Sequence, residues 1–267
     1  MGINGVSVNK FDDHALFVID SLSDEVKRLI RENFSAYCHG ADLAVNGGLM
    51  FKYEATLSFF LEVFDSKSED IQKGLIGELI IHVILKSLYK GFEVVSPYLN
   101  LEEKSIKKGF DLLLYEVTGK ELWITEVKSG GKRKNKCQNQ TISVLLADAR
   151  DDLKYRLSND ELNYWRNAIH AVRSAVEGTK DYKDVIVSIL QGEGEMVLRK
   201  SSTGADNSVV IVGVLFHDVA EQVELQTIQK FSERLNKKSP FKKSVVIGVQ
   251  KGTIEKVVDF LRSESKV

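Results

Sequence analysis

The chain has 267 residues, of which 43% are hydrophobic and 28% are charged. This length and composition are typical of a globular protein with a substantial hydrophobic core, and they exclude general disorder. The 37 basic and 38 acidic side chains leave a net charge of −1, so any nucleic-acid-binding surface must be a local basic patch. Cys38 and Cys137 form no CxxC pair, and we interpret them as free thiols in a reducing compartment.

Alternating strand and helix patterns follow one another along the chain. Strands are predicted from runs of β-branched and aromatic residues, and helices from apolar residues that recur every three or four positions. In chain order, we expect a strand at 15–19, helices at 23–37, 55–64 and 71–88, strands at 92–96, 109–115 and 121–127, helices at 138–157 and 160–176, a helix or strand at 185–190, a strand at 209–216, a helix at 225–235, a strand at 244–249 and a helix at 253–262. This order predicts an α/β fold with a central mixed sheet flanked by helices.

Local signals refine three of these boundaries. The capping box Ser21-Leu22-Ser23-Asp24 is expected to begin the first helix, and Gly91 to end the third. Gly119-Lys120 is expected to join the strands at 109–115 and 121–127 as a short hairpin. Since no Pro- or Ser-rich linker divides the chain, we expect one domain over residues 1–267.

The start of the chain has no basic segment followed by an apolar stretch, so we expect no signal peptide. No apolar run approaches the roughly 20 residues that a membrane span requires. Both observations favour a cytoplasmic protein that does not enter the membrane.

Charged residues interrupt the apolar strands in the middle of the chain. Glu126 and Lys128 are two positions apart on one strand, so they share a face, and Asp111 lies on the strand that pairs with it. Ionised carboxylates among apolar neighbours are costly unless they are paired or bound to a metal. Oxygen ligands of this kind suit Mg²⁺ or Mn²⁺, which polarise phosphodiesters and acidify water, while Lys128 is placed to stabilise charge on a phosphate.

An ordered set of residues resembles the PD-(D/E)xK nuclease superfamily: Glu78, then Gly109-Phe110-Asp111, then Thr125-Glu126-Val127-Lys128-Ser129. The resemblance implies a restriction-endonuclease-like core over about 70–157, with additions at 1–69 and 158–267. It also implies metal ligands at Glu78, Asp111 and Glu126, and a catalytic Lys128. The chain departs from the superfamily's pattern in one place, because Phe110 rather than a proline precedes Asp111.

A second resemblance covers more of the chain. The segments 107–116 and 121–129 are similar to those of the HamA family, the nuclease-like subunits of the bacterial Hachiman anti-phage system. This resemblance implies cleavage of DNA during infection and a superfamily 2 helicase, HamB, as partner. The chain has no GxxxxGK[ST] phosphate-binding loop, so ATPase activity would have to come from such a partner.

A basic, glycine-containing loop directly follows the strand that carries Lys128. We expect its cations to bind phosphates of the DNA backbone; they are Lys132, Arg133, Lys134 and Lys136. A solvated loop is an alternative interpretation. Gln138 and Gln140 open the next helix and are possible additions to the site, although a polar helix start explains them equally.

Other interpretations of the whole chain stay open at this point. Asp111 and Glu126 could be charges at a strand edge that face water, with Lys128 as their ion-pair partner. Glu78 could be a solvent-facing residue of an amphipathic helix. The protein would then be a catalytically silent subunit that binds DNA or regulates a helicase, and the sequence does not separate a DNA nuclease from an RNA nuclease.

Overall fold

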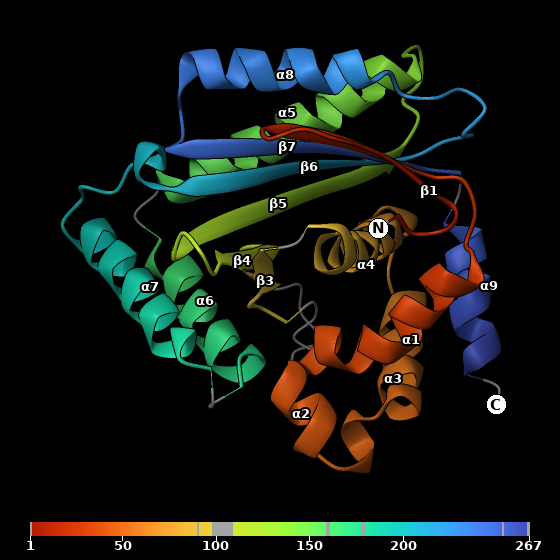
Figure 1. The fold of residues 1–267 in the computed structure, drawn as a ribbon, viewed down its shortest axis with the longest axis horizontal. Coiled ribbons are helices and arrows are strands. Elements are labelled where there is room, and N and C mark those ends of the chain that lie inside the picture. Colours follow the sequence, from red (N-terminus) through yellow and green to blue (C-terminus); the bar gives the residue numbers. More distant parts are fainter. Residues whose placement is uncertain are drawn as a thin grey trace.

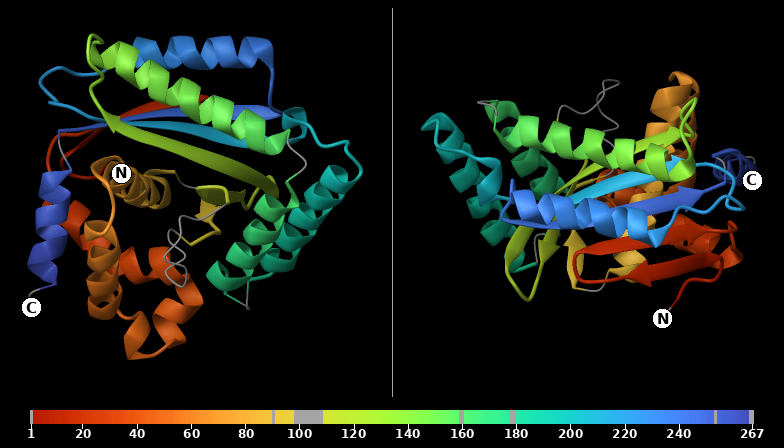
Figure 2. Two further views of the ribbon diagram at one scale, coloured as in Figure 1. Left: turned by 180° about the vertical axis from the view of Figure 1, so that it is seen from behind. Right: turned by 90° about the horizontal axis from the view of Figure 1, so that it is seen from above.

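The computed structural model describes residues 2–89, 91–97, 109–158, 161–177, 180–252 and 254–265. Within these residues, seven strands form one mixed and strongly curled sheet in the order β1-β2-β7-β6-β5-β4-β3 (Figure 2). The strands are β1 (Val6–Lys10), β2 (His14–Ile19), β3 (Phe92–Val94), β4 (Leu112–Glu116), β5 (Glu121–Gly131), β6 (Ser208–Phe216) and β7 (Lys243–Lys251). The neighbours β2, β7, β6 and β5 are parallel, whereas β1, β4 and β3 add antiparallel pairs at the two edges.

Helices cover both faces of the sheet (Figure 1). One face packs against α1 (Asp24–His39), α3 (Tyr53–Asp65), α4 (Glu69–Leu88) and α9 (Glu255–Glu264). The other face packs against α5 (Gln138–Leu157), α6 (Leu162–Ala175), α7 (Tyr182–Leu198) and α8 (Leu225–Lys238). The remaining short elements are α2 (Ala41–Asn46), η1 (Leu49–Phe51) and η2 (Gly204–Asp206).

Alternation along each strand divides the core into these two layers. On β5, Trp123 and Val127 pack on the α4 side, whereas Leu122 and Ile124 pack on the α5 side. The central strand β6 is buried along its whole length, because helices cover both of its faces. A strand buried on both faces has the nearly continuous apolar sequence seen at 208–216. This alternation fixes which face of the sheet each charged residue of β5 must occupy.

The expected order of strands and helices is confirmed in the described residues, with corrections at the ends of elements. Ser23, rather than Ser21, caps the first helix, since its Oγ accepts a hydrogen bond from Val26 N. The segment 185–190 is helical, within α7, and β5 continues to Gly131. The strand β1 and the short helix α2 were not expected. Residues 107–108 of the HamA resemblance, and the expected helix starts at 160 and 253, lie outside the described residues.

Strands from three parts of the chain meet in one sheet. The expected core, residues 70–157, supplies β3, β4 and β5, while residues 1–69 supply β1 and β2 and residues 158–267 supply β6 and β7. The description as one domain stays a prediction. Among the described residues, no helix has the length and apolar character needed to cross a membrane.

The helix α4 approaches β5 closely at Gly77. A Cβ added to Gly77 would lie 2.8 Å from Ser129 Cβ and closer still to its Oγ. Real Cβ atoms do not come this close, so a glycine is required for α4 to pack on the sheet at this height. Gly74, one turn earlier, has no atom within 4 Å of such a Cβ.

We therefore expect opposite effects from two alanine substitutions on α4. Gly77→Ala should lower the free energy of unfolding by about 1–3 kcal/mol, because α4 or β5 must shift. Gly74→Ala is the matched control and should be neutral or stabilising by up to about 1 kcal/mol, since alanine has the higher helix propensity. Urea denaturation of both variants measures the difference. Equal stabilities would contradict the close approach of α4 to β5.

Candidate functional site

The hairpin of β4 and β5 places Asp111 opposite Glu126. Leu112 pairs with Thr125 in the antiparallel ladder, so the positions immediately beyond them face each other. Asp111 directly precedes β4, and its Oδ2 accepts a hydrogen bond of 2.8 Å from Val127 N. This bond anchors the Asp111 carboxylate to the backbone of β5, next to Glu126.

Lys128 lies on the same face of β5 as Glu126, as the two-residue spacing predicts. Its Nζ donates to Glu126 Oε1 at 2.9 Å and lies 2.5 Å from Oδ2 of Asp152, on α5. The fold therefore brings Asp111, Glu126 and Lys128 together. Asp152 of α5 is a third carboxylate in this cluster, and it contacts Lys128.

Arg156 is a member of this cluster that was not predicted from the sequence. Its Nη1 donates to Glu126 Oε2 at 2.7 Å and to Gly109 O at 2.9 Å, and lies 3.8 Å from Asp111 Oδ1. Arg156 stands one helical turn after Asp152, so both project from one side of α5 towards β5. The sequence signal that could have indicated Arg156 is its i,i+4 spacing from Asp152, beside the apolar face of the expected helix 138–157.

Glu126 is fully buried, with no exposed surface. Burial and repulsion from the Asp111 carboxylate raise the pKa of Glu126 above its usual range, whereas Arg156 and Lys128 oppose the shift and favour the ionised form. Burial would lower the pKa of Lys128, but its contacts with Glu126 and Asp152 outweigh burial and raise it. Glu126 thus does not face water, although Lys128 is its ion-pair partner as the alternative interpretation expected.

Glu78 comes from the other side of the sheet. It lies on α4, and the adjacent Gly77 packs against Ser129, whose side chain faces away from α5. Glu126 and Lys128 point to the α5 side instead. The structure does not gather Glu78, Asp111 and Glu126 into a preformed ligand set, since the described residues contain no group of three Asp, Glu, His or Cys side chains that could hold a metal ion.

Two carboxylates, Asp111 and Glu126, have the oxygen chemistry that suits Mg²⁺ or Mn²⁺. Their mutual repulsion, which contributes to the raised pKa of Glu126, is the condition that a divalent cation relieves. Both oxygens of Glu126, however, already accept hydrogen bonds from cations. The residues fit a divalent cation on the condition that Glu126 releases Lys128 or Arg156.

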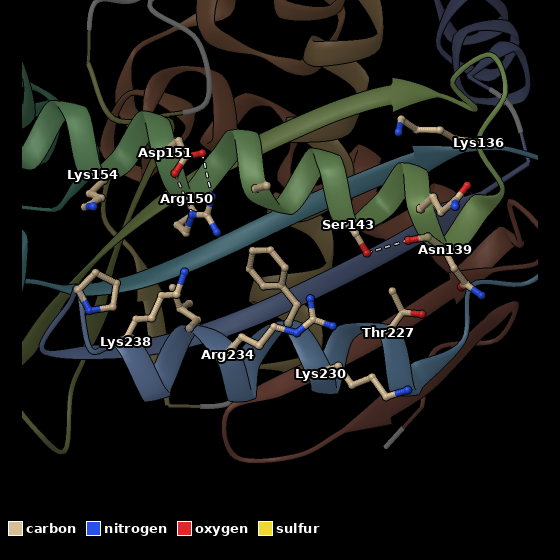
Figure 3. A pocket seen from close by; sticks show the side chains of 15 residues that line it. Lys136, Asn139, Ser143, Arg150, Asp151, Lys154, Thr227, Lys230, Arg234 and Lys238 are labelled. Atoms are coloured by element: carbon tan, nitrogen blue, oxygen red, sulfur yellow. Dashed lines mark hydrogen bonds and ion pairs between the residues drawn. The ribbon is translucent and has the colours of Figure 1, made fainter.

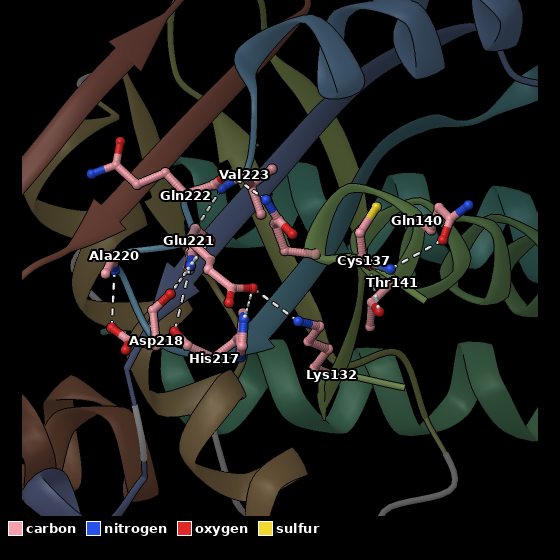
Figure 4. Close-up of polar contacts among 12 residues, drawn as sticks. Lys132, Cys137, Gln140, Thr141, His217, Asp218, Ala220, Glu221, Gln222 and Val223 are labelled. Carbon is pink, nitrogen blue, oxygen red and sulfur yellow. Dashed lines mark hydrogen bonds and ion pairs between the residues drawn. The ribbon is translucent and has the colours of Figure 1, made fainter. Parts of the chain in front are cut away.

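The basic loop after β5 is partly neutralised by acidic neighbours. Lys132 Nζ lies 2.8 Å from Glu221 Oε2, which also contacts His217 Nε2 at 2.9 Å (Figure 4). Arg133 pairs with Asp148 of α5 at 2.6 Å. Lys134 and Lys136 are exposed and form no ion pair with any described residue. The four loop cations are thus not equivalent, and their binding to DNA stays a prediction.

Gln138 and Gln140 have structural contacts at the start of α5. Gln140 Oε1 accepts a hydrogen bond from Cys137 N at 3.0 Å, which completes a capping box, and Gln138 Nε2 donates to Gln222 O at 3.2 Å (Figure 4). Gln140 precedes Arg156 by 16 residues, or about 24 Å along a helix. These contacts agree with the interpretation of both glutamines as a polar helix start.

A family model described as HamA matches residues 6–262, nearly the whole chain. None of the curated proteins compared with the chain matches it. The matched range includes α4, β5 and α5, which carry Glu78, Glu126, Lys128 and Arg156, and Asp111, which directly precedes β4. The chain therefore belongs to the HamA family, and this membership implies a component of the Hachiman defence system.

Proposed function

We propose that the protein is a metal-dependent nuclease that cleaves DNA phosphodiester bonds as the effector of a helicase-coupled anti-phage system. The observation that carries this proposal is the convergence of Asp111, Glu126 and Lys128 on one face of the β4–β5 hairpin. An aspartate on one strand, and a glutamate and a lysine two positions apart on the next, are the core of the PD-(D/E)xK pattern. Membership of the HamA family supports the defence context.

The order of elements supports a restriction-endonuclease-like core. The helix α4, the strands β3, β4 and β5, and the helix α5 follow one another along the chain, as the superfamily resemblance implies. The strands pair in chain order, and α4 and α5 lie on opposite faces of the sheet. The proposal assigns catalysis to Asp111, Glu126 and Lys128 of this core, as the resemblance implies.

Asp111 and Glu126 would hold Mg²⁺ or Mn²⁺, and Glu78 stays a proposed further ligand that would have to reach the ion from the α4 side of the sheet. Such an ion would supply Lewis-acid polarisation of the scissile phosphodiester and acidification of water. Lys128 remains protonated at neutral pH because its pKa is raised, so its ammonium can stabilise charge that develops on the phosphate. Asp152 holds Lys128 from the α5 side and orients it beside Glu126.

A second candidate function follows from the pairing of Glu126. Lys128 and Arg156 together satisfy both of its oxygens, so the cluster is also a stable buried ion network without any metal. On this interpretation the protein is a catalytically silent subunit that binds DNA or regulates a helicase. Metal dependence and single substitutions separate the two functions.

DNA cleavage by the purified protein, alone or with its helicase, should require Mg²⁺ or Mn²⁺. Excess EDTA should abolish it, and Ca²⁺ should support it poorly, because calcium coordination is more variable in number and geometry. Gel analysis of a labelled duplex in each ion measures the effect. Undiminished cleavage in EDTA rules out the metal-dependent mechanism, and no cleavage in any ion with the helicase present favours the silent subunit.

Glu126→Gln and Lys128→Ala should each reduce cleavage by about 100-fold or more, because each removes a charge from the reaction centre. Both variants should still fold. In Glu126→Gln, Arg156 retains its hydrogen bond to Gly109 O, and in Lys128→Ala the freed Asp152 carboxylate is exposed to solvent. Glu116→Gln, at the end of β4 in the same hairpin, is the matched control and should cleave like the wild type. Cleavage assays and thermal melting of all three variants are required. Wild-type turnover in either site variant would remove that residue from the mechanism.

The helicase HamB is the partner that HamA family membership implies. The flanking segments 1–65 and 160–267 are the expected docking surfaces, because the core must keep its site accessible to DNA. Within the first segment, α2 and η1 expose three large apolar side chains: Val45 at 67%, Leu49 at 86% and Met50 at 71%. Neighbouring apolar residues with this exposure are typical of a protein interface.

We therefore expect the protein to co-purify with HamB encoded beside it, through an interface of about 1,600 Å² or more. Leu49→Glu combined with Met50→Glu should weaken the complex, because each introduces a charge into an apolar contact. Val117→Glu, on an apolar residue that is 45% exposed in the β4–β5 turn, is the control and should leave it intact. Co-purification and size-exclusion chromatography measure association. Failure of the wild type to associate contradicts the helicase-coupled proposal. Unchanged association of the double variant shows that Leu49 and Met50 are not part of the interface.

A further inference from the structure

A basic groove runs between α5 and α8 on the outer surface of the protein (Figure 3). The two helices lie side by side over one face of the sheet, α5 above β5 and β6 and α8 above β7 and β2. The groove encloses about 790 Å³. Its cationic lining residues are Lys136, Arg150, Lys154, Lys230, Arg234 and Lys238. We call this hollow, with all its lining residues, the α5–α8 groove.

The cations stand in two facing rows. Lys230, Arg234 and Lys238 are four residues apart on α8, so they repeat about every 6 Å along one face of that helix. Arg150 and Lys154 have the same spacing on α5. The α5 wall extends from Gln140 to Lys154, which is about 21 Å or the length of about six base pairs. A regular row of this length matches a repeating polyanion better than a single small anion.

The groove concentrates positive charge that the chain as a whole lacks. Six cations and one carboxylate, Asp151, line it, giving a local charge of +5 on a chain whose net charge is −1. Asp151 pairs with Arg150, and its pKa is lowered by that contact and by the nearby Lys154 and Lys238. The other five cations form no ion pair with any residue that the structure describes: Lys136, Lys154, Lys230, Arg234 and Lys238. Such a cluster repels itself and attracts an anionic ligand.

Neutral donors and an apolar floor complete the groove. Asn139 and Thr227 line the end near Lys136 and offer amide and hydroxyl groups of the kind that bind phosphate oxygens, whereas the Ser143 hydroxyl donates to Asn139 O at 2.8 Å. Phe231 and Leu235 lie between the two rows, and the Arg150 guanidinium is 5.8 Å from the Phe231 ring centroid. The Arg150 guanidinium, which also pairs with Asp151, therefore lies beside this apolar floor.

We propose that the α5–α8 groove binds the phosphodiester backbone of a nucleic acid. The groove is separate from the candidate cleavage site, because Asp152 and Arg156 project from the opposite flank of α5. It includes Lys136 of the loop after β5, whereas Lys132 and Arg133 of that loop are paired with acidic residues outside it. Binding there depends on charge and spacing and does not require the nuclease activity proposed above.

The test is binding of the full chain to a short fluorescent DNA duplex, and to one of its strands, in EDTA over a series of salt concentrations. The groove variant is Lys230→Gln/Arg234→Gln/Lys238→Gln. The matched control removes the same charges from exposed residues of other elements: Arg166→Gln/Lys200→Gln/Lys256→Gln. A second groove variant, Lys136→Gln/Lys154→Gln, changes the α5 wall if the first fails to fold. Thermal melting checks each variant.

We expect the first groove variant to bind DNA more weakly and to reduce the slope of log K against log salt by up to about three, since each of the three cations neutralises one phosphate. The control should keep the wild-type slope. Equal slopes for groove variant and wild type, or equally weakened binding in groove variant and control, overturn the proposal. So does a groove variant that no longer binds HamB but still binds DNA, since the groove would then be a protein interface.

The groove proposal and the nuclease proposal can be tested separately. Lys128→Ala should reduce cleavage by about 100-fold or more, and the groove substitutions should still lower the salt slope in that background, because Lys128 lies on the other flank of α5. A groove variant that no longer binds DNA in EDTA leaves the metal-dependent site intact. Comparison of the duplex with the single strand shows which form of the backbone the groove prefers.

Discussion

The buried carboxylate of Glu126 is the constraint on which the candidate site depends. A fully buried ion is tolerated only when its charge and its hydrogen-bonding capacity are both satisfied, and here Lys128 and Arg156 satisfy them. Lys128 comes from the same strand, but Arg156 comes from the last turn of α5. The ion network therefore ties the end of α5 to the middle of β5, and Asp111 joins β4 to the same point.

This network depends on the architecture of the sheet. Glu126 lies on the strand at which the sheet changes from parallel to antiparallel pairing. The parallel strand β6 is on one side of β5, and the antiparallel strand β4 is on the other. Because β4 begins at Leu112, Asp111 stands at the end of the ladder and its carboxylate can turn towards the backbone of Val127.

Much of this arrangement could be predicted from the sequence, because it follows from local patterns. The spacing of Glu126 and Lys128 fixes a shared face. The register that places Asp111 opposite Glu126 could not be predicted, because four residues, 117–120, join β4 and β5 rather than the two-residue turn expected at Gly119-Lys120. Arg156 could not be assigned in this way, since its contact depends on how α5 lies across β5. The α5–α8 groove depends on the packing of helices separated by 67 residues, from Leu157 to Leu225, so no local window contains it.

The helix α5 connects the two charged regions of the protein. Residues 150, 151 and 154 line the groove, whereas Asp152 and Arg156 contact the β5 cluster from the other flank. A polyanion in the groove would neutralise Lys154, which stands between Asp152 and Arg156 along the helix. The proposed binding of a metal ion by Glu126 would require release of Lys128 or Arg156, and Arg156 would have to move its side chain or the end of α5. Because both sets of side chains stand on α5, a shift of its last turn would move Lys154 of the groove and Arg156 of the site together.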